Sequence, residues 1–260
     1  MQVTPIKTHK ITKKDKDIFK ILDKYIPKLQ EKSVVAVTSK IIAICEGRIV
    51  HKDLTTKDKL VEQEAEWFLP RHLSKYDFCI SIKNNTFTAS AGVDESNGNG
   101  YYVLWPSNPQ RSANALRLHL KQRFNLNKIG VIITDSKTTP LRWGVTGVAV
   151  AHSGFSALNS YIGKPDVFGR LLKAEKLNVA DTLATAAVGV MGEGNEQTPL
   201  AIIEDVPFVR FQPRNPTQNE LKDLHIQLED DLYAPLLRGV KWKKGKGASE
   251  KLWSNGVSPD

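Results

Sequence analysis

The segment GVIITDS, residues 130–136, indicates the fold of this chain more directly than any other stretch. Gly130 to Ile133 form a short apolar run typical of a buried strand, and the run leads directly into Asp135. In α/β proteins, the groups that bind ligands commonly lie at the carboxyl ends of strands. Asp135 is therefore a better candidate for a site residue than a carboxylate on the surface of a helix.

Similar patterns on both sides of this segment predict an alternation of strands and helices. Apolar runs predict strands, and apolar residues that repeat every three or four positions predict helices. The predicted strands cover residues 34–37, 144–154 and 200–203, with a hairpin formed by 78–82 and 87–90. The predicted helices cover residues 41–45, 57–69, 109–124 and 179–191, with another that begins at Thr12 and ends near Pro27. This order indicates an α/β (mixed α+β) fold.

Several polar residues are expected to be structural. The basic face of the 109–124 helix, which includes Arg117, is expected to be exposed to solvent. His152 lies in a glycine-interrupted apolar strand and is expected to have a structural role. Cys45 and Cys79 have apolar neighbours and are expected to be buried thiols, which fits a reducing cytoplasm.

The composition indicates a folded globular protein. The chain has 260 residues, of which 40% are hydrophobic and 25% charged. Its length fits one large or two small domains. No apolar run approaches the roughly 20 residues that span a bilayer, and the N-terminal residues lack the apolar core of a signal peptide. These features argue against a membrane or secreted protein and favour the cytoplasm.

Much of the positive charge lies near the C-terminus. The net charge is +9, and basic residues are concentrated between Arg238 and Lys251. We therefore expect a main domain over residues 1–238 and a basic tail over 239–260, whose composition is typical of segments without fixed structure. One alternative function follows, in which the lysines of the tail bind nucleic-acid phosphates while Trp242 and Trp253 stack on bases. Against it, the chain has no recognised nucleic-acid-binding motif, and basic tails commonly serve solubility.

Three acidic segments stand next to predicted strand or helix ends. They are Asp94 to Asn97, Asp135 with Ser136, and Glu193 to Glu196. Hard oxygen ligands of this kind suit Mg²⁺ or Mn²⁺, and a pair of such ions can neutralise nucleotide phosphates during phosphoryl transfer. Basic residues are then needed beside the phosphates, and the candidates are Lys40, Arg48, Arg142 and Lys164.

Short motifs through most of the chain carry a family resemblance. They are VTSK (37–40) with EGR (46–48), AGVD (91–94) with SN (96–97), VIITDS (131–136), RWGVTG (142–147), IGKPD (162–166) with FGR (168–170), VAD (179–181) and VMGE (190–193). In sequence and in order they resemble the coenzyme F(420)-0:L-glutamate ligases, also called γ-glutamyl ligases. The resemblance implies a two-lobed α/β ligase fold and an intertwined homodimer.

The same resemblance implies an enzyme that joins L-glutamate through an amide bond to an acceptor carboxylate. It implies GTP or ATP as co-substrate, two sites for Mn²⁺ or Mg²⁺, K⁺ as a further ion, and an acyl phosphate intermediate. By the resemblance, the catalytic residues are Asp94, Asp135 and Glu193, and the metal ligands are Asp94, Asp135, Ser136 and Glu193. The nucleotide-binding residues would be Thr8, His9, Lys10, Ile11, Ser39, Lys40, Asn97, Met191, Gly192, Glu193, Gly194, Asn195, Glu196, Gln197 and Thr198.

Two departures from the family pattern leave the acceptor open. Ile44 stands where members often have a lysine, and residues 137–140 replace a Gly-Arg-Pro-like segment. The 137–140 segment and residues 95–100 resemble a branch of γ-glutamate ligases associated with folate metabolism. Both a deazaflavin precursor and a folate-like carboxylate therefore remain candidate acceptors. The change at Ile44 also leaves open a degenerate homologue that binds nucleotide without turnover.

Overall fold

The central element is a mixed five-stranded sheet with the strand order β1-β12-β2-β8-β9. The computed structural model describes residues 1–247. The strands are β1 (Gln2–Ile6), β12 (Leu200–Glu204), β2 (Val34–Thr38), β8 (Gly130–Thr138) and β9 (Val145–Ser153). Only the β2–β8 pair in this sheet is parallel, so the carboxyl ends of these two strands lie at the same edge. This edge carries the segments in which the sequence places site residues.

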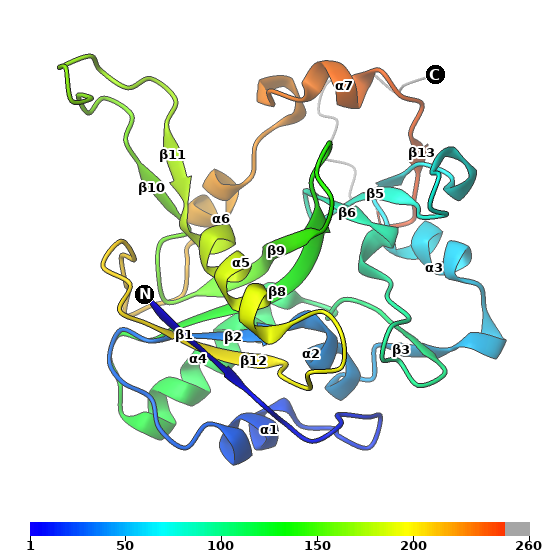
Figure 1. Ribbon diagram of the computed structural model, residues 1–260, viewed down its shortest axis with the longest axis horizontal. Coiled ribbons are helices and arrows are strands. Elements are labelled where there is room, and N and C mark those ends of the chain that lie inside the picture. The colour runs from blue at the N-terminus through cyan, green and yellow to red at the C-terminus, as the bar shows by residue number, and fades with distance from the viewer. Residues whose placement is uncertain (248–260) are drawn as a thin grey trace.

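Helices cover both faces of this sheet (Figure 1). One face packs on the helices α1 (Ile18–Tyr25), α2 (Ser39–Cys45) and α4 (Pro109–Phe124). The other face packs on α5 (Val179–Met191). Residues of β2 alternate between the two cores, with Val35 on the α4 side and Ala36 on the α5 side. A near-continuous apolar strand is the expected pattern when both faces of a sheet are covered.

A smaller sheet, with the order β13-β4-β5-β6, forms a second packed body. Its strands are β4 (Trp67–Phe68), β5 (Ile80–Lys83), β6 (Thr86–Ala89) and β13 (Lys243–Lys244). The helix α3 (Lys57–Glu64) packs on it, and the pair β3 (Ile49–His51) and β7 (Tyr101–Val103) lies beside it. These observations confirm the mixed α/β class.

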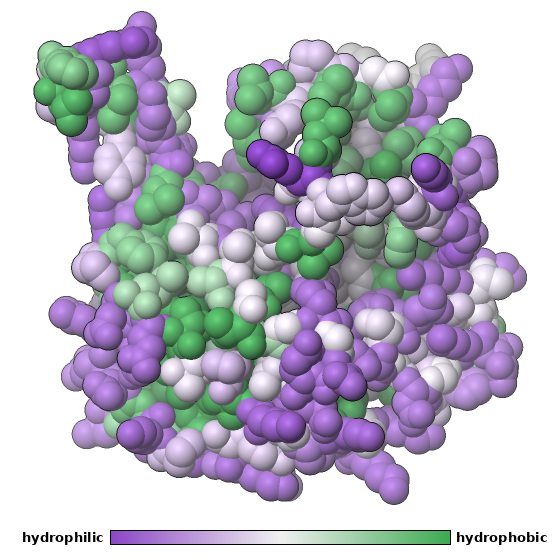
Figure 2. All heavy atoms as spheres, viewed as in Figure 1, coloured by the Kyte–Doolittle hydropathy of each residue, from purple (hydrophilic) through white to green (hydrophobic). Residues whose placement is uncertain are grey.

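The remaining elements are short. They are β10 (Leu158–Ser160), β11 (Lys176–Asn178), α6 (Gln218–Leu224), α7 (Ala234–Arg238) and the 3-10 turns η1 (Lys52–Leu54), η2 (Arg71–Leu73), η3 (Ser90–Gly92) and η4 (Leu228–Asp230). The β10–β11 pair projects from the body as an arm (Figure 1), and apolar residues gather at its tip (Figure 2). Val167 and Phe168 in this arm are 91% and 94% exposed. The intertwined homodimer that the family resemblance implies stays a prediction.

Two predicted helices have different bounds in the structure. The first helix begins at Ile18, because Asp17 rather than Thr12 caps its backbone N–H groups. Asp15 instead accepts a hydrogen bond from the Thr12 backbone and belongs to a turn. The helix predicted to reach Leu69 ends at Glu64, and Trp67 and Phe68 form β4. Pairing of β4 with β5 and β13 outweighs the helical periodicity of this stretch.

Arg117 corrects the expectation of a solvated basic face on α4, because it is only 5% exposed. Its guanidinium donates to the side chain of Asn215, at 2.8 Å, and to Ser153 Oγ. Arg117 therefore ties α4 to β9 and to the segment that precedes α6. Burial lowers the pKa of this guanidinium.

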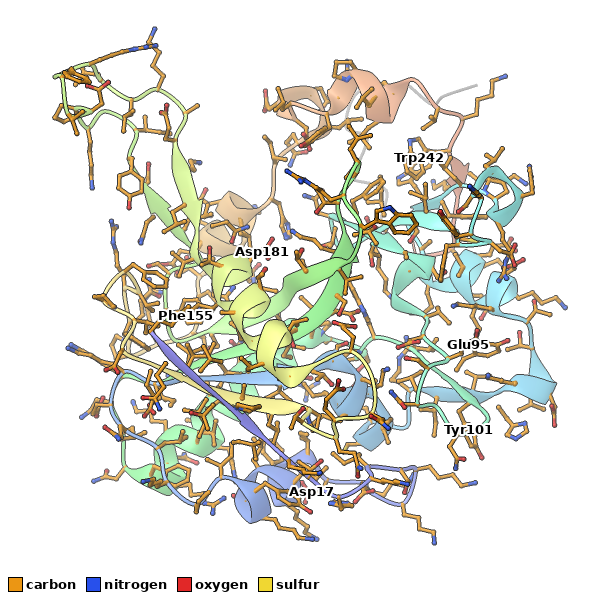
Figure 3. The ribbon with its side chains drawn as sticks, in the orientation of Figure 1. Asp17, Glu95, Tyr101, Phe155, Asp181 and Trp242 are labelled. Carbon is orange, nitrogen blue, oxygen red and sulfur yellow. The ribbon has the colours of Figure 1, made fainter. Side chains whose placement is uncertain are left out.

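The first residues of the predicted basic tail pack on the smaller sheet. Trp242 is 6% exposed, and its indole N–H donates to the Leu237 carbonyl at 2.7 Å (Figure 3). Lys243 and Lys244 form β13 against β4. The burial of Trp242 contradicts the idea that its ring stacks on nucleic-acid bases. Trp253 and the rest of the predicted tail, 248–260, lie outside the described residues.

Among the residues that the structure describes, no helix combines the length and the apolar character needed to cross a membrane. Cys45 and Cys79 are both buried and neither forms a disulfide, as the sequence predicted.

His152 is buried in β9, as expected for a structural residue, and it makes stability depend on pH. Its side chain is enclosed, and its Nε2 has no hydrogen-bond partner in the described part of the chain. Burial lowers the pKa of His152 to about 4. An unfolded chain, with a histidine pKa of about 6.5, therefore binds the proton first as the pH falls.

We expect wild-type protein to lose about 2 kcal/mol more stability between pH 7 and pH 5 than the variant His152→Leu, which cannot titrate there. Urea unfolding at the two pH values measures this difference. Equal losses in both proteins would show that His152 does not cause it.

Candidate active site

A cavity of about 930 Å³ lies where β2 ends and β8 continues past it. The strand predicted to end before Asp135 is longer in the structure, so Asp135 and Ser136 lie within β8 and pair with β9. Every residue that the family resemblance assigned to catalysis, metal or nucleotide binding lines the cavity. These residues come from segments far apart in the chain: Thr8 to Ile11, Ser39 and Lys40, Asp94 to Asn97, Asp135 and Ser136, and Met191 to Thr198. The structure therefore places the three predicted acidic segments around one space.

Asp135 and Asp94 form the acidic centre of the cavity. Asp135 accepts hydrogen bonds from the indole N–H of Trp105 and the backbone N–H of Ser136. Burial raises the pKa of Asp135 to about 6, and the negative charge of Asp94 adds to this effect. Two neighbouring carboxylates that repel each other are a favourable environment for a cation.

Asp94 forms an ion pair with Lys40, which also lines the cavity. The Lys40 ammonium lies 2.6 Å from Asp94 Oδ2, and Ser96 donates to both Asp94 oxygens. Burial by itself raises the pKa of Asp94, but Lys40 and the hydrogen bonds outweigh it, so the pKa lies below its usual value. Asp94 is therefore ionised at neutral pH.

Glu193 reaches the same centre from the loop after α5. The hydroxyl of Ser136 donates to Glu193 Oε1 at 2.6 Å. Within residues 1–247, no group of three or more His, Cys, Asp or Glu side chains is close enough to hold a metal ion by itself. The donor set nevertheless fits Mg²⁺ or Mn²⁺, because it consists of carboxylate and hydroxyl oxygens around a region of excess negative charge.

The loop of residues 192–198 forms one wall of the cavity. α5 ends at Met191 and is followed by Gly192, whose φ of +79° is readily adopted only by glycine. Glu196 folds back to accept a hydrogen bond from the Gly194 backbone at 2.8 Å. Asn97 donates to the Gly194 carbonyl, and the Thr8 backbone donates to the Gln197 carbonyl. The predicted nucleotide-binding segments are thus hydrogen-bonded to one another.

His9 fixes the N-terminal segment that faces this loop. Its Nδ1 lies 2.8 Å from the Tyr25 hydroxyl and its Nε2 lies 2.8 Å from Asp15 Oδ1. Contacts on both ring nitrogens restrict the orientation of the imidazole. The segment from Thr8 to Ile11 is therefore anchored to the main body through α1 and the turn before it.

The basic candidates for phosphate contacts separate in the structure. Lys40 lines the cavity, whereas Arg142 and Lys164 do not. Arg48 is paired with Glu64, with its Nη2 2.7 and 2.8 Å from the two carboxylate oxygens. Ile44 also lines the cavity, so a lysine at that position would face it. Lys40 is the candidate that the geometry favours.

Sequence reasoning missed two sets of residues at the site. Lys57, Phe78 and Thr88 line the cavity, and the indole N–H of the buried Trp105 donates to Asp135. They belong to no polar motif of the kind that marks a ligand loop, so the sequence carried no signal for them. Their role follows only from the way in which the smaller sheet packs beside β8.

The fold and the cavity define a class: an α/β protein with an acidic, ligand-sized cavity at the point where the pairing of two parallel strands ends. A family model described as "F(420)-0:Gamma-glutamyl ligase" matches residues 5–205. The chain belongs to this family, as the resemblance in its motifs indicated.

Three curated relatives support the assignment, and each is named coenzyme F(420):L-glutamate ligase. The Methanococcus maripaludis protein is 33% identical over 222 residues, which cover 84% of this chain and 85% of the relative. The Methanopyrus kandleri protein is 35% identical, covering 67% and 75% of the two chains. The Methanocaldococcus jannaschii protein is 32% identical, covering 69% and 79%.

Proposed function

We propose that this protein is a ligase that joins L-glutamate to an acceptor carboxylate in the biosynthesis of coenzyme F(420), using a nucleoside triphosphate and divalent cations. The observation that carries the proposal is the meeting of Asp94, Asp135, Ser136 and Glu193 with the 191–198 loop around one cavity. Membership of the family and the names of the relatives support the reaction class.

The proposed reaction has two steps, phosphoryl transfer and amide formation. An oxygen of the acceptor carboxylate attacks the γ-phosphorus of the nucleotide, and the nucleoside diphosphate leaves. The glutamate amine then attacks the carbonyl carbon of the acyl phosphate, losing a proton as inorganic phosphate leaves. Asp94, Asp135, Ser136 and Glu193 would hold Mg²⁺ or Mn²⁺, which when bound supplies charge neutralisation at the phosphates. K⁺ is proposed as a further ion.

The protein's own residues would position the nucleotide on one side of the acidic centre. The 192–198 loop offers backbone groups, and the hydrogen bond from Asn97 to Gly194 holds this loop near Asp94. Lys40 pairs with Asp94 and lines the cavity, so its ammonium would exchange Asp94 for a phosphate when the nucleotide binds. Holding the reacting groups in this way contributes through proximity and orientation.

The acceptor would bind on the other side, at the face lined by Lys57 and Phe78. Phe78 is 50% exposed, and the Lys57 ammonium lies 5.6 Å from the centre of its ring. An aromatic surface with an adjacent cation suits a planar ring system that carries negative charge. This arrangement favours a deazaflavin-type or pterin-type acceptor over an aliphatic one.

Phe78→Ala is expected to raise the KM for the acceptor about tenfold, because lost aromatic stacking costs on the order of 1 kcal/mol or more. The KM for the nucleotide should change little. Phe87→Ala is the matched control, since Phe87 is exposed, packs on Trp242 and does not line the cavity. Equal effects of the two substitutions would place the acceptor elsewhere.

Phosphate release by purified protein tests the proposed function. The reaction would contain Mn²⁺ or Mg²⁺, L-glutamate and GTP or ATP, with the deazaflavin precursor compared against folate-type acceptors and products analysed by mass. A glutamate mass increment on one acceptor would establish both reaction and substrate. Nucleotide binding without release for any acceptor would instead support the degenerate homologue.

A further inference from the structure

Trp105 is a buried residue that contacts the acidic centre through its indole N–H. The side chain is 1% exposed, and its indole N–H donates to Asp135 Oδ2. The other oxygen, Oδ1, accepts the backbone N–H of Ser136 at 2.9 Å. An indole N–H can only donate, so this contact favours the carboxylate form and fixes its rotation about the side-chain axis.

The position of the indole depends on the absence of a side chain at Gly92. A Cβ built at Gly92 would lie 2.2 Å from Trp105 Nε1, a distance at which the two cannot coexist. The φ of Gly92 is +69°, which also favours glycine. The glycine of the AGVD motif therefore leaves room for the indole two positions before Asp94.

An ion cluster that includes the buried Lys83 contacts the indole and the backbone of Trp105. The Lys83 ammonium lies 5.5 Å from the centre of the Trp105 ring and 2.6 Å from Glu64 Oε2. Arg48 pairs with the same Glu64 and donates from Nε to the Trp105 carbonyl at 3.1 Å. Lys83 is 8% exposed, so these contacts form in a region with little water.

We propose that Trp105 is a positioning residue that holds the Asp135 carboxylate in a fixed orientation toward the cavity, supported by Gly92 and by the Lys83–Glu64–Arg48 cluster. The inference rests on the proposed function, because it concerns the use of Asp135 as a cation ligand. Groups that orient a ligand from behind commonly change metal affinity by about 10- to 100-fold when they are removed.

The test compares Trp105→Phe with Trp242→Phe. Both substitutions keep an aromatic ring and remove a buried indole N–H, but the Trp242 N–H donates to a backbone carbonyl away from the cavity. Mn²⁺ binding is measured by the electron paramagnetic resonance signal of the free ion, without substrates. We expect Trp105→Phe to weaken Mn²⁺ binding about 10- to 100-fold and Trp242→Phe to leave it unchanged.

Kinetics and thermal unfolding separate positioning from a loss of structure. Trp105→Phe should lower kcat while the acceptor KM stays within about twofold, and both variants should show similar melting temperatures. Unchanged Mn²⁺ affinity and kcat in a folded Trp105→Phe protein would overturn the inference and leave the proposed function standing. Absence of Mn²⁺ binding by the wild-type protein would overturn the metal-dependent function and this inference together.

Discussion

Replacement of Asp135 by Asn is expected to reduce turnover by about 1000-fold or more, the scale seen when a preorganised electrostatic group is removed from an active site. Asn has the same shape and can still accept the hydrogen bond from Trp105. Asn carries no negative charge, so the acidic centre would keep only the charge of Asp94, which lies close enough to affect Asp135. Phosphate release under saturating substrates measures the loss.

The same substitution should not unfold the protein. Burial raises the pKa of Asp135 to about 6, which means that the folded protein disfavours its charged form. Removing the charge at pH 8 is therefore expected to leave the melting temperature unchanged or higher. Wild-type turnover in Asp135→Asn would exclude this residue from the cation ligands.

Asp181, in the first turn of α5, provides a matched control (Figure 3). Its carboxylate pairs with Lys137 at 2.8 Å and accepts the Ala149 backbone N–H, but it does not line the cavity. Asp181→Asn should lower stability while retaining turnover. Loss of turnover in Asp135→Asn and loss of stability in Asp181→Asn would show that the charge of Asp135 serves the reaction and that the charge of Asp181 serves folding.

Gly147→Ala is expected to destabilise the protein by about 3 kcal/mol, the upper range for inserting a methyl group into a packed interior. Gly147 lies in β9 directly under α5, and a Cβ there would be 2.3 Å from the Ala184 carbonyl oxygen. That atom belongs to the helix backbone, so the whole helix must move. Because α5 leads into the 192–198 loop, nucleotide affinity should fall as well.

Gly189→Ala is the control for this prediction. Gly189 lies in the same helix, and nothing stands within 4 Å of a Cβ built there. Alanine favours the helix over glycine by about 0.5–1 kcal/mol, so this variant should be slightly more stable than wild type. Urea unfolding of both variants would measure effects of opposite sign. A neutral Gly147→Ala would show that α5 can shift without cost.

The elements that could be predicted from the sequence are those with local determinants. The helices 109–124 and 179–191 have the predicted bounds, because Asn108 and Asn178 cap them directly before their first residues. The 78–90 hairpin is also confirmed, with Asn84 and Asn85 both at positive φ in its turn. In each case the signal lies within a few residues of the boundary that it sets.

The errors arose where distant residues decide the local structure. Trp67 and Phe68 became a strand because β5 and β13 flank them, and Arg117 is buried because Asn215 lies beside it. Neither partner could be inferred from the helical periodicity that was used. Motifs identified the candidate carboxylates of the site. That these carboxylates lie around one cavity depends on the strand order, which cannot be read from the positions of the motifs along the chain.

The strand order also determines when the cavity can form during synthesis. Within residues 1–247, β1 pairs with β12 alone, and the Thr8 backbone is hydrogen-bonded to Gln197. Two adjoining segments of the cavity wall are therefore almost 200 residues apart in the chain. Residue 204 must emerge from the ribosome before β1 can pair fully with β12. Until then the nascent chain carries an unpaired β2 edge and no complete cavity, and an unpaired strand edge is prone to aggregation.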